Sequence, residues 1–105
     1  MAGHHDLCFG CGLANVFGLH LEDGRFFVKQ DHQGPDGRAH PGVIAAALVE
    51  ALTLAEGAAP ERLEVSFEAM PAVGTFVSVD AQGGGAEARD DEGALVASAK
   101  AAFRV

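Results

Sequence analysis

The sequence predicts an α+β fold in which an antiparallel sheet of about five strands wraps around one central helix, at about residues 41–56. Residues 43–55 predict the helix and are apolar on almost every face. A helix of this kind is enclosed by other structure, because a surface helix keeps one polar face. The segments after it alternate between apolar and polar residues, as strands with one buried face do. A sheet of this size buries a helix on all sides only if it curves around it.

The chain before this helix is expected to form an irregular N-terminal stretch and one hairpin. Residues 1–18 are rich in glycine and show little periodicity. Residues 19–22 and 25–30 are predicted as two strands, because the Asp23-Gly24 dipeptide between them favours a tight hairpin turn. Residues 31–40 contain glycine and proline breakers and are expected to form a loop.

The bounds of the helix follow from residues with unusual backbone properties. Pro41 suits the first helical position, where its missing N–H would have no partner in any case. Gly57 and Pro60 are expected to end the helix. Four strands are predicted after it, over residues 63–70, 75–81, about 86–89 and 94–105.

Length and charge limit the classes of function. The 105 residues fit a single domain, residues 1–105, and a core of this size is only marginally stable alone, which favours the assembly of subunits. Seven Lys and Arg residues are scattered among fifteen acidic residues, so no basic face is available for a nucleic acid. Neither a signal peptide nor a transmembrane segment is recognised, so we expect a cytoplasmic protein with no membrane partner.

Two cysteines, Cys8 and Cys11, form a Cys-x-x-Cys pair. A structural zinc site needs two further ligands, which His4 and His5 would supply in principle. A redox pair prefers the start of a helix after a strand, and the glycine-rich surroundings argue against that. We therefore expect two reduced thiols in a structured turn, with no tightly bound metal and no cofactor.

Three segments together resemble a known family. Residues 8–12 (CFGCG), followed by Asn15, resemble the N-terminal signature of the PaaI-like branch of the hotdog-fold acyl-CoA thioesterases. Residues 32–46 (HQGPDGRAHPGVIAA) look like the loop and helix start of that family, and residues 91–99 (DEGALVASA) are similar to its closing strands. Each segment alone is a weak signal, but the three occur in the family's order.

The resemblance implies a hotdog fold, in which the sheet curls around the central helix. It also implies a homodimer or homotetramer that hydrolyses an acyl-CoA or a related thioester in a groove between subunits. In such enzymes a backbone N–H just after a histidine at the helix start polarises the thioester carbonyl, aided by the positive end of the helix. A carboxylate one or two turns into the helix then acts as base or nucleophile.

The chain departs from the family pattern at both of these points. Pro41 follows His40 and has no N–H to donate, and Val49 occupies the usual position of the acid. The neighbouring Gly42 N–H and the Glu50 carboxylate are expected to take over these roles. The predicted catalytic residues are therefore Glu50, Gly42, His40 and Gln33, and the predicted substrate-binding residues are Asn15 and Arg38.

Each of these residues also has an ordinary structural role open to it. Glu50 would pair with an arginine at the subunit face, and His40 would cap the helix. Gln33 would make a hydrogen bond within the loop, Asn15 would support a turn, and Arg38 would be a solvated surface charge. Two functions therefore stay open: a thioesterase, or a degenerate hotdog module that binds an acyl thioester or another small ligand without turnover. Further candidate contacts to the phosphates of CoA are Lys29, Arg62 and Arg104.

Overall fold

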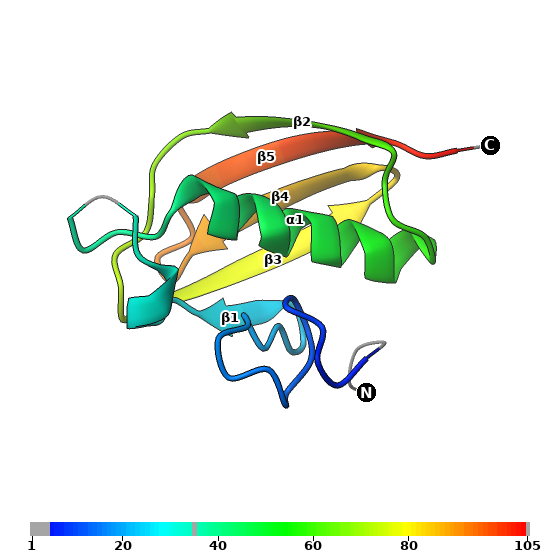
Figure 1. The fold of residues 1–105 in the computed structure, drawn as a ribbon. Helices are drawn as coiled ribbons and strands as arrows, with labels where there is room; N and C mark the ends of the chain where they lie inside the picture. The colour runs from blue at the N-terminus through cyan, green and yellow to red at the C-terminus, as the bar shows by residue number, and fades with distance from the viewer. Residues whose placement is uncertain (1–4, 35, 105) are drawn as a thin grey trace.

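The computed structural model describes residues 5–34 and 36–104. One helix, α1, crosses the concave face of a five-stranded antiparallel sheet (Figure 1). The strands lie in the order β1-β3-β4-β5-β2. Their bounds are Arg25–Phe27 for β1, Arg62–Phe67 for β2, Phe76–Gln82 for β3, Gly85–Asp90 for β4 and Leu95–Ala102 for β5. A short 3-10 turn, η1, spans Gln30–His32.

The predicted helix is confirmed, and α1 spans Pro41–Glu56. Pro41 is the first helical residue, and the His40 side chain caps the first turn by accepting a hydrogen bond from the Gly42 N–H at 2.8 Å. Gly57 ends the helix in the left-handed conformation (φ 79°), which glycine adopts without a steric penalty. No helix in the described part of the chain is long and apolar enough to cross a membrane.

The core lies between α1 and the concave face of the sheet. The helix contributes four fully buried apolar residues, namely Ile44, Ala47, Leu48 and Leu52. The sheet contributes residues that alternate with exposed ones along β3 and β4, because successive side chains of a strand point to opposite faces. The buried positions on the sheet include Val77, Val79, Ala86, Ala88, Val96, Ala97 and Ala99.

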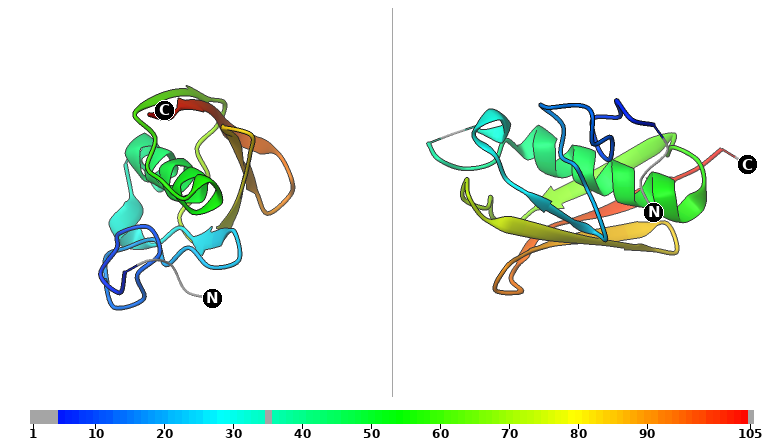
Figure 2. Two further views of the ribbon diagram at one scale, coloured as in Figure 1. Left: turned by 90° about the vertical axis from the view of Figure 1, so that its right-hand side faces the viewer. Right: turned by 90° about the horizontal axis from the view of Figure 1, so that it is seen from below.

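The sheet curves around the helix, as the sequence predicts. Figure 2 shows, along the helix axis, the sheet passing from β2 on one side of α1 to β1 on the other. Residues 5–18 continue this cover beyond β1 and lie against the helix. The sheet and the N-terminal segment together therefore bury a helix that has few polar side chains of its own.

The Asp23-Gly24 turn is confirmed. Both residues have positive φ (53° and 75°), as the mirror-image hairpin turns require. Glu22 and Arg25 exchange both backbone hydrogen bonds across this turn, at 2.9 and 3.0 Å. The local dipeptide therefore determines the conformation of the turn.

The predicted first arm of that hairpin, residues 19–22, is not a strand. Its ladder is replaced by bonds to the N-terminal segment: Leu19 N–H donates to the Phe9 carbonyl and Leu21 N–H donates to the Gly10 carbonyl, each at 2.7 Å. Leu19 and Leu21 are buried and belong to the hydrophobic core. The N-terminal segment thus accepts the backbone hydrogen bonds that residues 19–22 would otherwise make within a regular hairpin.

The remaining strands occur where they are predicted, with shifted ends. β1 ends at Phe27 instead of residue 30, because residues 30–32 turn into η1. β2 ends at Phe67 instead of residue 70, where the N–H groups of the next two residues both point to the Val96 carbonyl. β5 ends at Ala102, and Val105 of the predicted last strand lies outside the described residues.

Candidate functional site

The N-terminus of α1 carries His40 on the surface. His40 Nδ1 accepts the Gly42 N–H at 2.8 Å, so Nδ1 is unprotonated in this arrangement and the ring proton is on Nε2. The Gly42 N–H, predicted as the oxyanion donor, is therefore already bonded to the side chain of His40, which is itself a predicted catalytic residue. A ligand oxygen reaches this N–H only if the His40 ring moves away.

The loop before the helix holds His40 through its backbone. His40 N–H donates to the His32 carbonyl at 2.8 Å, and Gly34 N–H donates to the Arg38 carbonyl at the same distance. Gly34 has to be a glycine here, because a Cβ at this position would lie 2.7 Å from the His40 Cα. The helix start is thus packed directly on its own loop.

Gln33 and Arg38 both stabilise this loop. The Gln33 side chain donates to Gln30 Oε1 at 3.1 Å and accepts the Gly37 N–H at 3.0 Å. Arg38 Nη1 donates to the Met70 carbonyl at 2.8 Å and so ties the loop to the chain after β2. Both residues are exposed. Gln33 makes the loop hydrogen bond that the sequence left open to it, whereas Arg38 bonds to a backbone carbonyl instead of being only a solvated surface charge.

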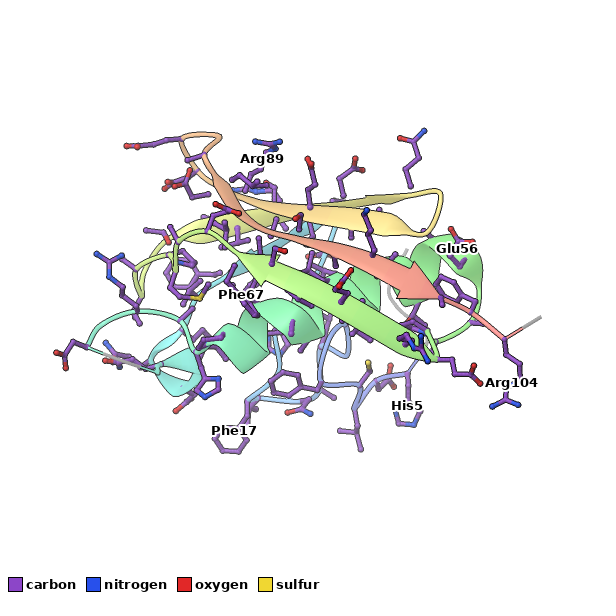
Figure 3. The ribbon with its side chains drawn as sticks, turned by 90° about the horizontal axis from the view of Figure 1, so that it is seen from above. His5, Phe17, Glu56, Phe67, Arg89 and Arg104 are labelled. Atoms are coloured by element: carbon purple, nitrogen blue, oxygen red, sulfur yellow. The ribbon has the colours of Figure 1, made fainter. Side chains whose placement is uncertain are left out.

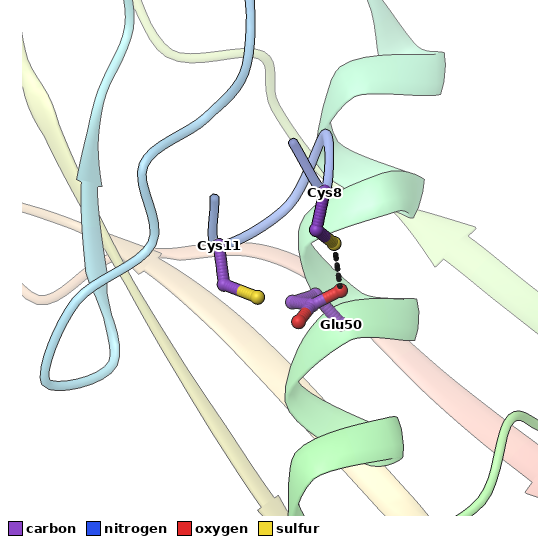
Figure 4. Close-up of side chains that lie close together, drawn as sticks. All are labelled: Cys8, Cys11 and Glu50. Atoms are coloured by element: carbon purple, nitrogen blue, oxygen red, sulfur yellow. Dashed lines mark hydrogen bonds between the residues drawn. The ribbon is translucent and has the colours of Figure 1, made fainter. Parts of the chain in front are cut away.

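Glu50 lies away from the helix N-terminus. A helix rises about 1.5 Å per residue, so Gly42 and Glu50 are roughly 12 Å apart along the axis of α1. Glu50 is only 6% exposed, and its Oε1 accepts a hydrogen bond from Cys8 Sγ at 3.4 Å (Figure 4). The backbone of Gly10 covers the carboxylate so closely that a Cβ there would lie 2.5 Å from Oε1. The N-terminal segment therefore covers Glu50, which lies about two helical turns from Gly42.

Asn15 supports a turn within the N-terminal segment. Its Nδ2 donates to the Leu7 carbonyl at 3.0 Å, and its Oδ1 accepts the Phe17 N–H at 3.1 Å. Side-chain bonds of this kind are typical of asparagine in turns. No contact among the described residues joins the Asn15 side chain to His40 or to Arg38.

Several candidate phosphate contacts already have partners within the chain. Lys29 Nζ donates to the Val16 carbonyl at 3.0 Å. Arg104 forms an ion pair with Glu61, and both side chains are largely exposed. A hollow of about 300 Å³ lies beside β1, and its lining includes Arg25, Lys29, Phe27 and Phe76 but not His40 or Glu50. Aromatic rings and cations are groups that bind nucleotides, although Glu22 and Asp23 also line this hollow.

Comparison with known proteins identifies the fold. No sequence model of a protein family matches the chain, and no curated protein is significantly similar to it. Among solved structures, a thioesterase superfamily protein is 20% identical over 77% of this chain and 47% of its own, with a TM-score of 0.64. This chain thus spans about half the length of that protein.

Two further solved structures are similar over most of their own length. The PaaI protein of the Escherichia coli phenylacetic acid degradation operon is 15% identical over 73% of this chain and 70% of its own, with a TM-score of 0.60. A hypothetical thioesterase from Streptococcus pneumoniae, solved with coenzyme A, is 14% identical over 77% of each chain, with a TM-score of 0.63. This chain has the hotdog fold.

The hotdog core of this chain also contains a buried histidine that the sequence did not single out. His32 is 1% exposed and lies edge-on to the rings of Phe9 and Phe26, with centroids 6.4 Å away in each case. Its Nδ1 accepts the Lys29 N–H at 3.1 Å, and its Nε2 donates to the Phe17 carbonyl at 3.2 Å. Burial lowers the pKa of His32 below its ordinary value, because the charged ring loses its solvation.

The folded chain brings together a group of potential metal ligands that are distant in sequence. Cys8, Cys11 and Glu50 offer ligand atoms that all lie within 4.8 Å of one another. The sequence indicated the two cysteines, but no local pattern connects them to a glutamate about forty residues later. The predicted site residues thus separate into two regions: His40, Gly42, Gln33 and Arg38 at the start of α1, and Asn15 and Glu50 at the N-terminal segment.

Proposed function

We propose that this hotdog protein binds acyl-CoA or a related thioester and hydrolyses it at the N-terminus of α1. The observation that carries the proposal is the exposed His40–Gly42 pair at the start of a 16-residue helix whose first turn contains no acidic residue. The positive end of a helix favours the oxygen of a carbonyl that gains negative charge. The similarity to structures described as thioesterases, one of them solved with coenzyme A, supports the class of ligand.

In the first step of the proposed reaction, the Gly42 N–H changes its hydrogen-bond acceptor. The thioester oxygen replaces His40 Nδ1 as the partner of the Gly42 N–H, and the helix start then stabilises the developing oxyanion. Pro41 contributes no donor, so Gly42 provides the first available N–H of the helix.

The released imidazole of His40 then acts as the general base. It takes a proton from a water molecule that adds to the thioester carbonyl, and it returns the proton to the sulfur as the carbon–sulfur bond breaks. The products are a free acid and the thiol of CoA. We assign this role to His40 in place of Glu50, because the Cys8 side chain and the backbone of Gly10 cover the Glu50 carboxylate.

We further propose that two or more copies of the chain form the groove. Large apolar side chains are exposed along residues 7–17, and Figure 3 shows that the Phe17 ring points away from the body of the protein. A protein of this size gains stability when such residues are buried between subunits. The exposed apolar residues of this segment are Leu7, Phe9, Leu13, Val16 and Phe17.

Three features favour a second function, in which the protein binds the thioester without turnover. Pro41 removes the usual donor, Val49 replaces the usual acid, and the Gly42 N–H is already bonded to His40. A groove with these groups would hold a thioester while lacking part of the usual hydrolytic machinery.

A single pair of measurements distinguishes the two functions. Hydrolysis is followed by the release of free thiol across short-chain, medium-chain and aromatic acyl-CoAs, and calorimetry measures the binding of CoA and of a non-hydrolysable acyl-CoA thioether. Catalytic release of thiol supports the thioesterase. Binding of the thioether without thiol release supports the binding module. If neither CoA nor the thioether binds at millimolar concentration, both proposals are wrong.

A further inference from the structure

The three side chains at the N-terminal segment have the spacing of metal ligands. Cys8 Sγ and Glu50 Oε1 are 3.4 Å apart, and the Cys11 sulfur lies within 4.8 Å of both side chains' ligand atoms (Figure 4). Zinc binds thiolate sulfur at about 2.3 Å and carboxylate oxygen at about 2.1 Å with tetrahedral angles, which separates neighbouring ligands by roughly 3.6 Å. The observed sulfur–oxygen distance is therefore close to that of two ligands on one ion.

The backbone around these side chains is already arranged to hold them. The Cys8 carbonyl accepts the Gly12 N–H at 2.8 Å, which closes the turn that carries both thiols. Gly12 approaches the backbone of Cys8 so closely that a Cβ there would lie 2.4 Å from the Cys8 nitrogen. Gly10 lies equally close to the Glu50 carboxylate. The two glycines thus let the cysteine turn lie directly against α1.

Burial and ligand type indicate which ion fits. Cys11 is 2% exposed and Glu50 is 6% exposed, whereas Cys8 is half-buried, so solvent reaches the group mainly at Cys8. Two sulfur ligands select zinc over magnesium or calcium, which prefer oxygen ligands throughout. The three ligands come from two segments that are far apart in the chain, so an ion bound by them would hold these segments together and stabilise the fold.

We propose that Cys8, Cys11 and Glu50 bind one Zn²⁺ ion that fastens the N-terminal segment to α1. Binding releases the two thiol protons, including the proton that Cys8 donates to Glu50 in the metal-free protein. The fourth ligand is a water molecule, because no other His, Cys, Asp or Glu of the described residues belongs to this group. His5 is exposed and its Nδ1 accepts the Leu7 N–H at 3.0 Å, and His4 lies outside the described residues.

This proposal replaces the expectation of metal-free thiols. That expectation considered only the Cys-x-x-Cys pair, which provides half of a zinc site, and the adjacent His4 and His5. The third ligand comes from a helix that begins about thirty residues later in the chain.

The wild-type protein provides the first test. Untagged protein purified without chelator is analysed for metal, then stripped and titrated with zinc and with cobalt. We expect about one equivalent of zinc per chain, a thiolate-to-cobalt absorption band, and slower alkylation of both cysteines when zinc is present. Stripped protein that takes up no zinc at micromolar concentration, or whose cysteines are alkylated at the same rate with and without zinc, would show that the proposal is wrong.

Substitutions provide the second test. Cys8→Ser and Cys11→Ser should each weaken zinc binding by about a hundredfold or more, and Glu50→Gln by about tenfold or more. Glu56→Gln is the matched control, because Glu56 is an exposed acid in the last turn of the same helix. Circular dichroism verifies that each variant is folded before titration. Equal affinity in the wild type and in the double cysteine variant would contradict the site. Since metal binding is measured without substrate, its result is independent of thioester hydrolysis.

Discussion

The Gly42 N–H donates a 2.8 Å hydrogen bond to the His40 ring, and this bond links the start of the helix to the group proposed as the base. In the protein without ligand, this bond occupies the Gly42 N–H, which is the donor that the reaction needs. The ligand therefore has to compete with a neighbouring side chain for one backbone N–H.

The Gly42 N–H is tested by a pair of substitutions at one position. Either Gly42→Ala or Gly42→Pro adds a Cβ that would lie 3.0 Å from His40 Nδ1 and displace the ring slightly. Only proline removes the N–H. We expect kcat/KM for the best acyl-CoA to fall by about a hundredfold in Gly42→Pro and by much less in Gly42→Ala, as for the loss of one oxyanion donor. Similar values of kcat/KM in the two variants would show that the Gly42 N–H is not the oxyanion donor.

His40 and Glu50 are the two candidates for the base. We expect His40→Gln to lower kcat by about a hundredfold or more, because glutamine keeps a polar side chain but accepts no proton at neutral pH. Glu50→Gln should keep kcat within a few-fold, since the carboxylate is covered by the N-terminal segment. The control is His5→Gln, an exposed histidine elsewhere. A collapse of kcat in Glu50→Gln alone, with the thermal midpoint unchanged, would restore Glu50 as the base.

The buried His32 predicts a pH dependence of stability. Its pKa is lower in the folded protein than the ordinary value of 6.5, so the unfolded chain binds the proton more readily. Stability contributed by the neutral ring is therefore complete above about pH 6.5 and is lost as the pH falls below that value. We expect the free energy of unfolding, measured with chelator present, to fall between pH 7 and pH 5. His32→Gln should lessen this slope, and an identical slope in the variant would contradict the role of His32.

The helix core predicts unequal effects of two similar truncations. Leu48→Ala removes a fully buried side chain from α1 and should lower the free energy of unfolding by about 2–5 kcal/mol. Leu54→Ala, on the same helix but 46% exposed, should lower it by less than about 1 kcal/mol. Urea unfolding measures both values. Equal losses would mean that another subunit or segment buries Leu54.

The exposed apolar side chains predict self-association. Sedimentation at micromolar concentration should give a dimer or a larger assembly rather than the 10.8 kDa monomer. Phe17→Asp should weaken the assembly, because it places a charge among the exposed apolar residues of the N-terminal segment. A stable monomer in the wild type would contradict the proposal that two or more copies of the chain form the groove.

The N-terminal third of the chain contains one turn that matches its prediction and one predicted strand that does not form. The Asp23-Gly24 turn is predicted correctly because both residues tolerate the positive φ that the turn requires. The arm before it is predicted as a strand, but its N–H groups bond to Phe9 and Gly10 instead. A two-residue turn is decided locally, whereas the choice of a strand's partner depends on which segment lies beside it.

The sequence by itself determined the helix at residues 41–56, the strands after it and the curvature of the sheet. These features follow from periodicity, from Pro41 and Gly57 at the helix ends, and from the need to bury a helix that is apolar on nearly every face. Only the tertiary structure decided that Glu50 faces the two cysteines and that His32 is enclosed between aromatic rings. Both arrangements join residues that are far apart in the chain, and no local pattern encodes which distant segment covers a given side chain. The physical reason is that burial is a property of the packed molecule, while helix and strand periodicity is a property of neighbouring residues.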